Sequence, residues 1–328
     1  MTLKKVITLG GATQDIFIQS EDAGIQHLHP GAKIEVSSLH YASGGGATNT
    51  AVAFKRLGCE VTTFFKIGHD AAGQAIINQL KENSITTDQV AYSPKTNTGT
   101  SFIIPAPAGD RIIFAYRGAN AEITPAELPL HAVATADCVY ITSLAGNSAR
   151  VLSSITKAAK ESSLVAVNPG KNQLANPTVL LEALSSIDIF IVNSSEARTF
   201  MQSLNLKTDK HELVQELTNY FKTILQRGPR IAVVTNGAGG VYVATKQAIY
   251  FCPSVHDTII NTVGAGDAFG SCFVASLLQE LPIEQAIING VINSASVLSH
   301  PDAKTGLLDW DTIQKRARSI AATQLQIF

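Results

Sequence analysis

The stretch Val263-Gly264-Ala265-Gly266-Asp267-Ala268-Phe269-Gly270, VGAGDAFG, places a carboxylate directly after three of the smallest residues and before an apolar run, CFVASLL. That run is typical of a buried helix, so we expect Asp267 in the helix's first turn. Small residues there let backbone N–H groups converge on an anion that the helix dipole also attracts. A neighbouring carboxylate suits phosphoryl transfer to a hydroxyl group. The alternative is an ordinary helix start in which Asp267 complements the dipole.

Outward from this stretch, strand-length apolar runs alternate with helix-period segments. The runs are nearly continuous in Val, Ile and Phe, as expected for strands covered on both faces; they lie at 4–10, 59–68, 138–144, 164–168, 188–193 and 230–236. Helical stripes occupy residues 48–58, 211–228 and 282–300. The alternation predicts an α/β fold with a doubly wound, mostly parallel sheet flanked by helices.

Two segments, about 14–42 and 98–118, break this rhythm because they are extended and contain turns but no helical stripe. The second has a hairpin pattern with its turn near residues 107–110. We expect both to leave the main domain and form a small β-sheet lid, and we expect a further hairpin at 239–251. No repeat or long linker divides the chain, so the prediction is a single domain over residues 1–328.

Composition narrows the class of protein. The chain has 328 residues, a net charge of −1 and 45% hydrophobic residues, which argues against a nucleic-acid-binding surface or a polybasic membrane contact. No apolar run approaches the roughly 20 residues that span a bilayer, and the N-terminus is typical of a first strand. The cysteines are scattered without metal-ligand spacing, which indicates free thiols in a reducing compartment: Cys59, Cys138, Cys252 and Cys272. We expect a cytoplasmic enzyme.

Two further motifs have the chemistry of a small-molecule site. In SGGGATN, residues 43–49, three glycines allow a ligand close to the backbone, and Asn49 offers both a donor and an acceptor. In TLGGATQD, Asp15 follows the first strand, where a carboxylate can hold sugar hydroxyls. The alternatives are a flexible turn for the glycines and a solvated turn residue for Asp15.

Two more motifs suit a nucleotide. In VNSSE, Asn193 and Glu196 follow a strand and could hold a hydrated Mg²⁺ beside phosphates, although the pattern also fits a helix capping box. TNGAGG, residues 235–240, is a glycine-rich loop that could pass under a nucleotide, although the pattern is weak by itself.

Together these motifs give the chain a family resemblance. It resembles the ribokinase-like family of small-molecule kinases, also called the PfkB carbohydrate kinases, over essentially its full length. The resemblance rests on five motifs in the family's order: GxxxxD at 10–15, GGGxxN at 44–49, NxxE at 193–196, TxGxxG at 235–240 and GAGDAF at 264–269. Any one of them is common, but five in this order on an alternating βα chain are specific.

The resemblance implies a role for each matching residue. Asp267 matches the catalytic base, and Gly264, Ala265 and Gly266 match the anion hole. The substrate-binding positions correspond to Asp15, Gly45, Gly46 and Asn49. Asn193 and Glu196 match the pair near Mg²⁺ and the phosphates, with Glu196 acting on the metal through water. The nucleotide loop corresponds to Thr235, Gly237, Gly239 and Gly240, and Asn293 corresponds to a residue near the adenine. In many members the lid mediates a homodimer.

Three residues qualify these expectations. Many members have Asp six residues before the base, where it helps bind a monovalent cation; here the residue is Asn261, so potassium activation is not assumed. Arg117 and Arg111 lie in or near the lid and could reach a charged group on a substrate, although exposed lid arginines are equally consistent with the sequence.

The sequence therefore predicts an ATP-dependent, Mg²⁺-requiring kinase that phosphorylates a hydroxymethyl group of a sugar or sugar-like molecule. Two alternatives stay open. The first is a nucleoside kinase of the adenosine type on the same fold, since ribose also offers vicinal hydroxyls. The second is a non-catalytic sugar or nucleotide sensor.

Overall fold

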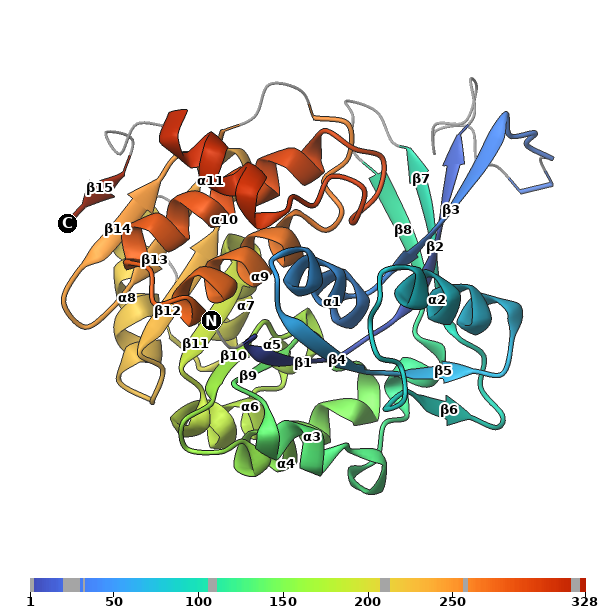
Figure 1. The fold of residues 1–328 in the computed structure, drawn as a ribbon, viewed down its shortest axis with the longest axis horizontal. Helices are drawn as coiled ribbons and strands as arrows, with labels where there is room; N and C mark the ends of the chain where they lie inside the picture. The colour runs from blue at the N-terminus through green and yellow to red at the C-terminus, as the bar shows by residue number, and fades with distance from the viewer. Residues whose placement is uncertain are drawn as a thin grey trace.

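A nine-stranded sheet forms the centre of the protein in a computed structural model, which describes residues 3–19, 30–31, 33–105, 111–206, 213–255, 259–319 and 325–328. The strand order is β15-β14-β13-β12-β11-β10-β9-β1-β4 (Figure 1). Six neighbouring strands are parallel: β12 (Ile231–Thr235), β11 (Ile189–Asn193), β10 (Leu164–Val167), β9 (Cys138–Ile141), β1 (Lys5–Leu9) and β4 (Glu60–Phe64). The predicted mostly parallel α/β sheet is confirmed.

Antiparallel strands complete one edge of this sheet. The predicted hairpin at 239–251 is confirmed, because β13 (Val241–Ala244) pairs antiparallel with both β12 and β14 (Ile249–Cys252). The short β15 (Gln326–Ile327) pairs with β14. A separate two-stranded sheet contains β5 (Lys66–Gly68) and β6 (Ala91–Ser93).

Alternation along each strand sorts side chains onto the two faces of the sheet. In β9, Tyr140 joins one hydrophobic cluster, whereas its neighbours Val139 and Ile141 join the other. In β11, Ile191 and Phe190 divide in the same way. Each face therefore needs its own layer of helices, which is why the strands are apolar on both sides.

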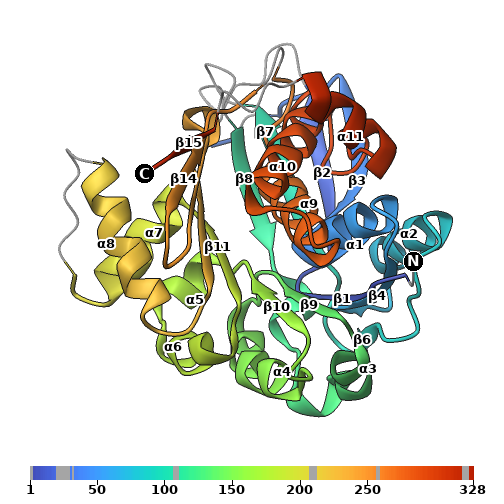
Figure 2. The ribbon, with the colours of Figure 1, turned by 60° about the vertical axis from the view of Figure 1, so that its left-hand side comes forward.

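The helices form those two layers (Figures 1 and 2). One hydrophobic cluster is covered by α1 (Gly46–Arg56), α2 (Ala71–Glu82), α9 (Ala265–Leu278), α10 (Ile283–Leu298) and α11 (Trp310–Ser319). The other is covered by α3 (Leu130–Thr135), α4 (Leu152–Ala158), α5 (Lys171–Ala175), α6 (Thr178–Ala183), α7 (Ser194–Ser203) and α8 (Leu213–Leu225). In the described residues, no helix is long and apolar enough to cross a bilayer. All four cysteines are buried and free, as predicted.

A four-stranded sheet stands at one end of the body, in the order β3-β2-β7-β8 (Figure 1). Its strands are β2 (Thr13–Gln19), β3 (Ser38–Gly44), β7 (Gly99–Pro105) and β8 (Arg111–Tyr116). The predicted small sheet is confirmed, and both predicted segments contribute to it. The expected turn at 107–110 and the middle of the first segment lie outside the described residues.

The register of the small sheet gives its two faces different characters. Directly paired residues share a face, so Asp15, Ala42, Ser101 and Ala115 form one row, and the buried carboxylate of Asp15 marks that face as the inner one. The alternate rows form the outer face, where apolar side chains are 43–56% exposed: Tyr41, Phe102, Phe114 and Tyr116.

Candidate active site

Helix α9 begins with backbone groups that are available to a ligand. Gly264 is its N-cap, with φ 83°, and no side chain caps the helix. The first helical hydrogen bond is donated by Ala268 N to Gly264 O over 2.8 Å, so the amides of residues 265–267 precede it. A Cβ atom added to Gly266 would meet nothing within 4 Å, which leaves open space above this turn. The arrangement therefore has the amides and the space that an anion hole needs.

Asp267 is held in this first turn by a residue from the glycine-rich segment. Asn49 Nδ2 donates to Asp267 Oδ2 over 2.8 Å. As a whole residue, Asp267 is only partly buried. Desolvation raises its pKa above the ordinary value, while the Asn49 hydrogen bond and the charge of Lys304 act in the opposite direction. The structure thus brings together the predicted base, the predicted anion hole and Asn49.

Asp15 lies on the inner face of the small sheet and is 6% exposed. Its Oδ1 accepts from Thr13 Oγ1 over 2.8 Å, and Ser101 also donates to the carboxylate. Burial raises the pKa of Asp15, and hydrogen bonds and Lys304 lower it in part. Asp15 is also close enough to Asp267 to raise the pKa of that carboxyl group. The predicted substrate carboxylate and the predicted base are therefore parts of one site.

The three glycines at 44–46 make this approach possible. A Cβ on Gly44 would lie 1.9 Å from Asp15 Oδ2, so any side chain there would displace the carboxylate. Gly45 adopts φ 89° and lies so close to the backbone of residues 11–12 that its Cβ would be 2.4 Å from Gly11 O. These contacts explain why the segment between β3 and α1 contains glycine, and they favour a built site over a merely flexible turn.

A cavity of about 300 Å³ adjoins the start of α9 and contains most of the predicted nucleotide residues. Asn193, Thr235, Gly237 and Gly240 line it together with Ala265 and Gly266. Its remaining wall is largely apolar: Val241, Val255, Ile259, Phe269, Val291, Ala295 and Leu298. An apolar slot that ends at free amides fits a flat base with phosphates attached. Gly239 belongs to the same turn, Gly237–Gly239, but does not line the cavity.

Asn193 and Glu196 form a reciprocal cap at the start of α7. Glu196 N donates to Asn193 Oδ1 over 2.9 Å, and Asn193 N donates to Glu196 Oε2 over 2.8 Å. The capping box expected as an alternative is therefore present. Burial raises the pKa of Glu196, and the charge of Asp267 raises it further, so the two carboxylates are neighbours. This donor set fits Mg²⁺, which is commonly held by one or two carboxylates together with phosphates and water.

Two predicted residues are not brought into this site. Asn293 is fully buried inside α10, where Nδ2 donates to Ala268 O and Oδ1 accepts from Leu308 N. The adjacent Ser294 lines the cavity instead. Arg117 is exposed beyond the end of β8, and its guanidinium has no hydrogen bond or ion pair with the described site residues. The side chain of Arg111 lies outside the described residues.

Sequence reasoning missed Lys304, which lies in the segment between α10 and α11 and is 5% exposed. Its Nζ donates to Asn49 Oδ1 over 2.7 Å, to Thr48 Oγ1 over 3.0 Å and to the carbonyl of Ser43. These partners are 255–261 residues away in the sequence, so no local motif marks the lysine.

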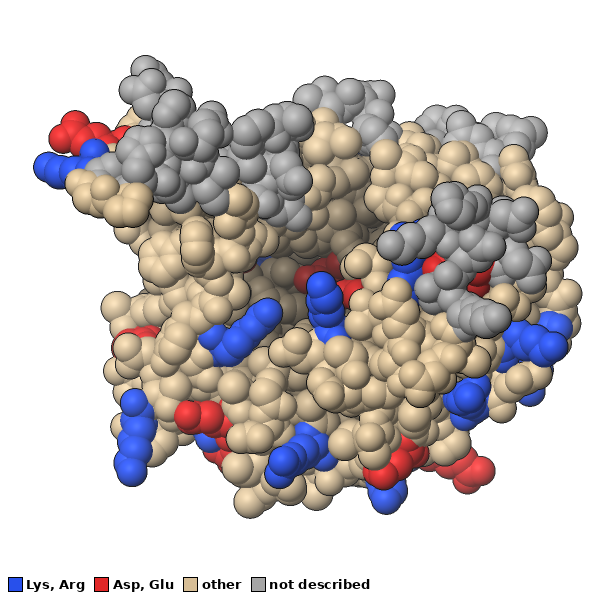
Figure 3. Space-filling view, turned by 180° about the vertical axis from the view of Figure 1, so that it is seen from behind, with Lys and Arg blue, Asp and Glu red and all other residues tan. Residues whose placement is uncertain are grey.

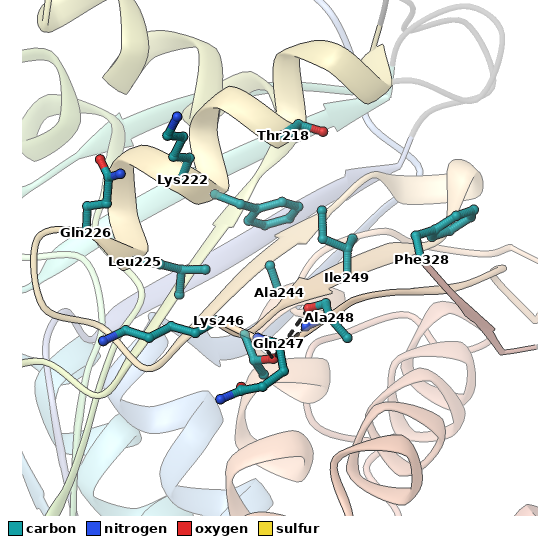
Figure 4. Close-up of a pocket in the computed structure, with 12 residues that line it drawn as sticks. Thr218, Lys222, Leu225, Gln226, Ala244, Lys246, Gln247, Ala248, Ile249 and Phe328 are labelled. Atoms are coloured by element: carbon teal, nitrogen blue, oxygen red, sulfur yellow. Dashed lines mark hydrogen bonds between the residues drawn. The ribbon is translucent and has the colours of Figure 1, made fainter.

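The surface is hollowed between the small sheet and the body, with acidic side chains on the floor of the hollow (Figure 3). A second cavity, of about 520 Å³, lies between α8 and the β13–β14 hairpin (Figure 4). Its lining includes Lys222, Lys246 and Phe328 but none of the predicted site residues. The candidate site therefore comprises the smaller cavity and the interacting carboxylates of Asp267 and Asp15.

Comparison with known proteins agrees with this geometry. The model of the pfkB family carbohydrate kinases matches residues 3–310. The chain is 29% identical to a ribokinase of Staphylococcus aureus, over 83% of this chain and 86% of that protein. A Methanocaldococcus jannaschii nucleoside kinase structure superposes with a TM-score of 0.80 at 22% identity, covering 97% of this chain and 99% of that one. An Arabidopsis thaliana ribokinase structure complexed with ribose and ATP gives 0.79 at 19% identity, covering 97% and 99%. The chain belongs to the pfkB family of carbohydrate kinases and is a phosphotransferase with an alcohol group as acceptor.

Proposed function

We propose that this protein is an ATP-dependent, Mg²⁺-requiring kinase that transfers the γ-phosphate to a hydroxymethyl group of a free sugar or sugar-like molecule. The observation that carries the proposal is the placement of Asp267. Asn49 holds the Asp267 carboxylate in the first turn of α9, beside the open amides of residues 265–267 and close enough to Asp15 for the two charges to interact. ATP would supply the phosphoryl group, and Mg²⁺ near Glu196 would neutralise charge on its phosphates.

In this proposal the chain contributes mainly by positioning. Asp15 accepts hydrogen bonds from sugar hydroxyls and fixes the acceptor against the small sheet. Asp267 orients the attacking hydroxyl and takes its proton late in transfer. The amides of Ala265 and Gly266 stabilise negative charge on the transferring group. Thr235, Gly237, Gly239 and Gly240 hold the nucleotide on the side away from the small sheet.

A nucleoside kinase is the second candidate, and one feature of the inner face favours it. Phe17 and His40 lie one row beyond Asp15 on that face, with ring centroids 5.8 Å apart, and Ile103 and Ile113 continue the same row. A flat base attached to ribose would find an apolar surface there. A non-catalytic sensor would need neither the base nor the open amides, so we set it aside.

A coupled assay of ADP release over a substrate panel tests the proposal. The panel contains ribose, fructose and 2-keto-3-deoxygluconate on one side, and adenosine, inosine and cytidine on the other. We expect saturable turnover on a free sugar. Turnover confined to nucleosides would support the second candidate, and failure to phosphorylate any member of a wider alcohol panel would contradict both.

We also propose that Asn261 attracts a monovalent cation only weakly, because it lacks the negative charge of an aspartate. Its Nδ2 donates to Pro301 O over 2.6 Å, and its Oδ1 accepts from Val263 N over 3.0 Å. This amide therefore ties together the two loops that flank the start of α9. An aspartate could not donate the first of these hydrogen bonds.

We further propose that the protein is a cytoplasmic homodimer, associated through the small sheet. Support for the dimer comes from the outer face, where Tyr41, Phe102 and Phe114 are 43–56% exposed side by side. A contiguous apolar patch of this kind is typical of an interface. The free, buried cysteines suit a reducing compartment.

A further inference from the structure

We propose that Lys304 is a positioning residue of the kinase site: its ammonium group fixes the Asn49 amide that holds Asp267 and supplies positive charge that acts on both Asp267 and Asp15. The inference rests on the proposed kinase function and extends it to a residue outside the five motifs. Lys304 approaches the site from the segment after α10, on the opposite side of Asn49 from Asp267.

The hydrogen bonds define the orientation of Asn49. Lys304 can only donate, so it must meet the oxygen of the amide, Oδ1, at 2.7 Å. The amide nitrogen then points the other way and donates to Asp267 Oδ2 at 2.8 Å. A flipped amide would set its NH₂ group against the ammonium and its oxygen against the carboxylate, which would be repulsive on both sides. Lys304 therefore determines which atom Asp267 meets.

Hydrogen-bond partners hold the Lys304 ammonium group in place. Its ammonium has three acceptors, the Ser43 carbonyl, Thr48 Oγ1 and Asn49 Oδ1, which match its three donors. Its backbone is fixed by Asp302, whose Oδ1 accepts from Lys304 N over 2.8 Å. The side chain is too well bonded to serve as a mobile phosphate ligand, so its effect must pass through Asn49 and through charge.

Lys304 also acts through its charge on the carboxylates of Asp15 and Asp267. Asp15 and Asp267 repel each other, and desolvation raises the pKa of both. The Lys304 charge lowers both values and so favours the carboxylate form that a base requires. Burial lowers the pKa of Lys304 itself to about 8, so its charge is lost as the pH rises through that value. The other titratable groups that face this cluster are Asp302, His40, Arg56, Glu196 and Tyr140.

The test compares Lys304→Met, Lys304→Arg and a matched control, Lys66→Met. Lys66 is also buried, at 7% exposure, but its Nζ bonds Glu127 at 2.7 Å and the carbonyl of Glu122, away from the kinase site. For Lys304→Met we expect kcat to fall on the order of 100-fold, because the base is misplaced. The acid limb of its pH profile should move to higher pH, because Asp267 loses a neighbouring positive charge that lowers its pKa. The KM for ATP should stay within about threefold of wild type.

Lys304→Arg distinguishes an effect of the Lys304 charge from an effect on folding. Arginine stays protonated, so the basic limb near pH 8 should disappear in this variant while part of the activity returns. If Lys304→Met does not fold, the test compares the basic limbs of the pH profiles of the wild-type and Lys304→Arg enzymes. Loss of the basic limb in Lys304→Arg then supports the proposed role of the Lys304 charge. A folded Lys304→Met enzyme with unchanged kcat and acid limb overturns the inference, as does a basic limb that Lys304→Arg leaves in place. Equal loss of kcat in Lys66→Met also overturns it. A wild-type protein without turnover would instead refute the proposed function.

Discussion

At the scale of single residues, Asp15 is the side chain that we propose binds the acceptor. It is 6% exposed and accepts a hydrogen bond from Thr13, and it lies close enough to Asp267 to raise the pKa of that carboxyl group. A carboxylate kept in so poorly solvated a place costs stability unless it has partners. We propose that a substrate hydroxyl is one of the partners of the Asp15 carboxylate.

Asp15→Asn should raise the KM for the phosphorylated substrate by roughly 10- to 100-fold, because a hydrogen bond to a charged acceptor is lost. The KM for ATP should change little, since the nucleotide cavity does not include this residue. Asp137→Asn is the control, because its carboxylate accepts from Lys5 N and Lys160 Nζ outside the site. Steady-state kinetics on the best panel substrate gives the answer; an unchanged KM for that substrate would remove Asp15 from the site.

At the scale of elements, the start of α9 combines two glycines with different reasons to be glycine. Gly264 has φ 83°, and a Cβ there would lie 2.3 Å from the Cβ of Ala303. Gly266 is helical and has open space where its Cβ would be, within the lining of the nucleotide cavity. The first glycine is required by the backbone, whereas the second leaves room for a ligand.

Gly266→Ala should therefore stabilise the folded protein by about 0.5–1 kcal/mol, because alanine replaces glycine within a helix. It should also lower kcat/KM for ATP at least about tenfold, because the methyl group occupies the space above the amides. Gly264→Ala is the companion variant and should be destabilised by about 1–3 kcal/mol through strain and overlap. Thermal unfolding and kinetics on both proteins check this pair. A Gly266→Ala enzyme with wild-type kcat/KM would show that the space holds no phosphate.

Some residues of the candidate site could be predicted from the sequence because they follow directly from the βα pattern. Asn193 and Thr235 are the last residues of β11 and β12, and parallel topology gathers such residues along one edge of a sheet. Asn293 was predicted near the adenine, but Ser294 lines the cavity. Adjacent helical residues point about 100° apart, so an error of one position moves a side chain from the pocket into the core.

The position of Lys304 in the site could not be predicted from the sequence. Its role depends on Ser43, Thr48 and Asn49, and those contacts exist only after α10 and α11 have packed near α1. In the sequence it is one lysine in the turn PDAKTG, where a solvated residue is the ordinary expectation. Local motifs thus identified the candidate reacting groups, whereas only tertiary packing reveals the lysine that we propose orients them.

At the scale of the whole molecule, the small sheet has a role on each face. Its inner face contributes Asp15 to the site, and its outer face exposes an apolar patch. Association through the outer face would cover the patch and stiffen the wall of the substrate pocket. Formation of the proposed dimer would therefore also affect catalysis.

Phe114→Glu should convert the dimer into a monomer, because it places a charge in the centre of the apolar face. Leu130→Glu is the control, since Leu130 is 45% exposed on α3 and does not belong to the small sheet. Size-exclusion chromatography with light scattering reports the mass of each protein. A monomeric wild type, or a Phe114→Glu variant that stays dimeric, would rule out this interface.

The activity of Asp267→Asn tests most directly whether Asp267 is the catalytic base. The substitution preserves the shape of the side chain but removes its ability to accept a proton, so kcat should fall by about 10³-fold. The affinity for ATP, measured separately by titration calorimetry, should stay within about threefold, because the amides of Ala265 and Gly266 remain. Substantial turnover by Asp267→Asn would contradict the assignment of Asp267 as the base that faces the transferring phosphoryl group.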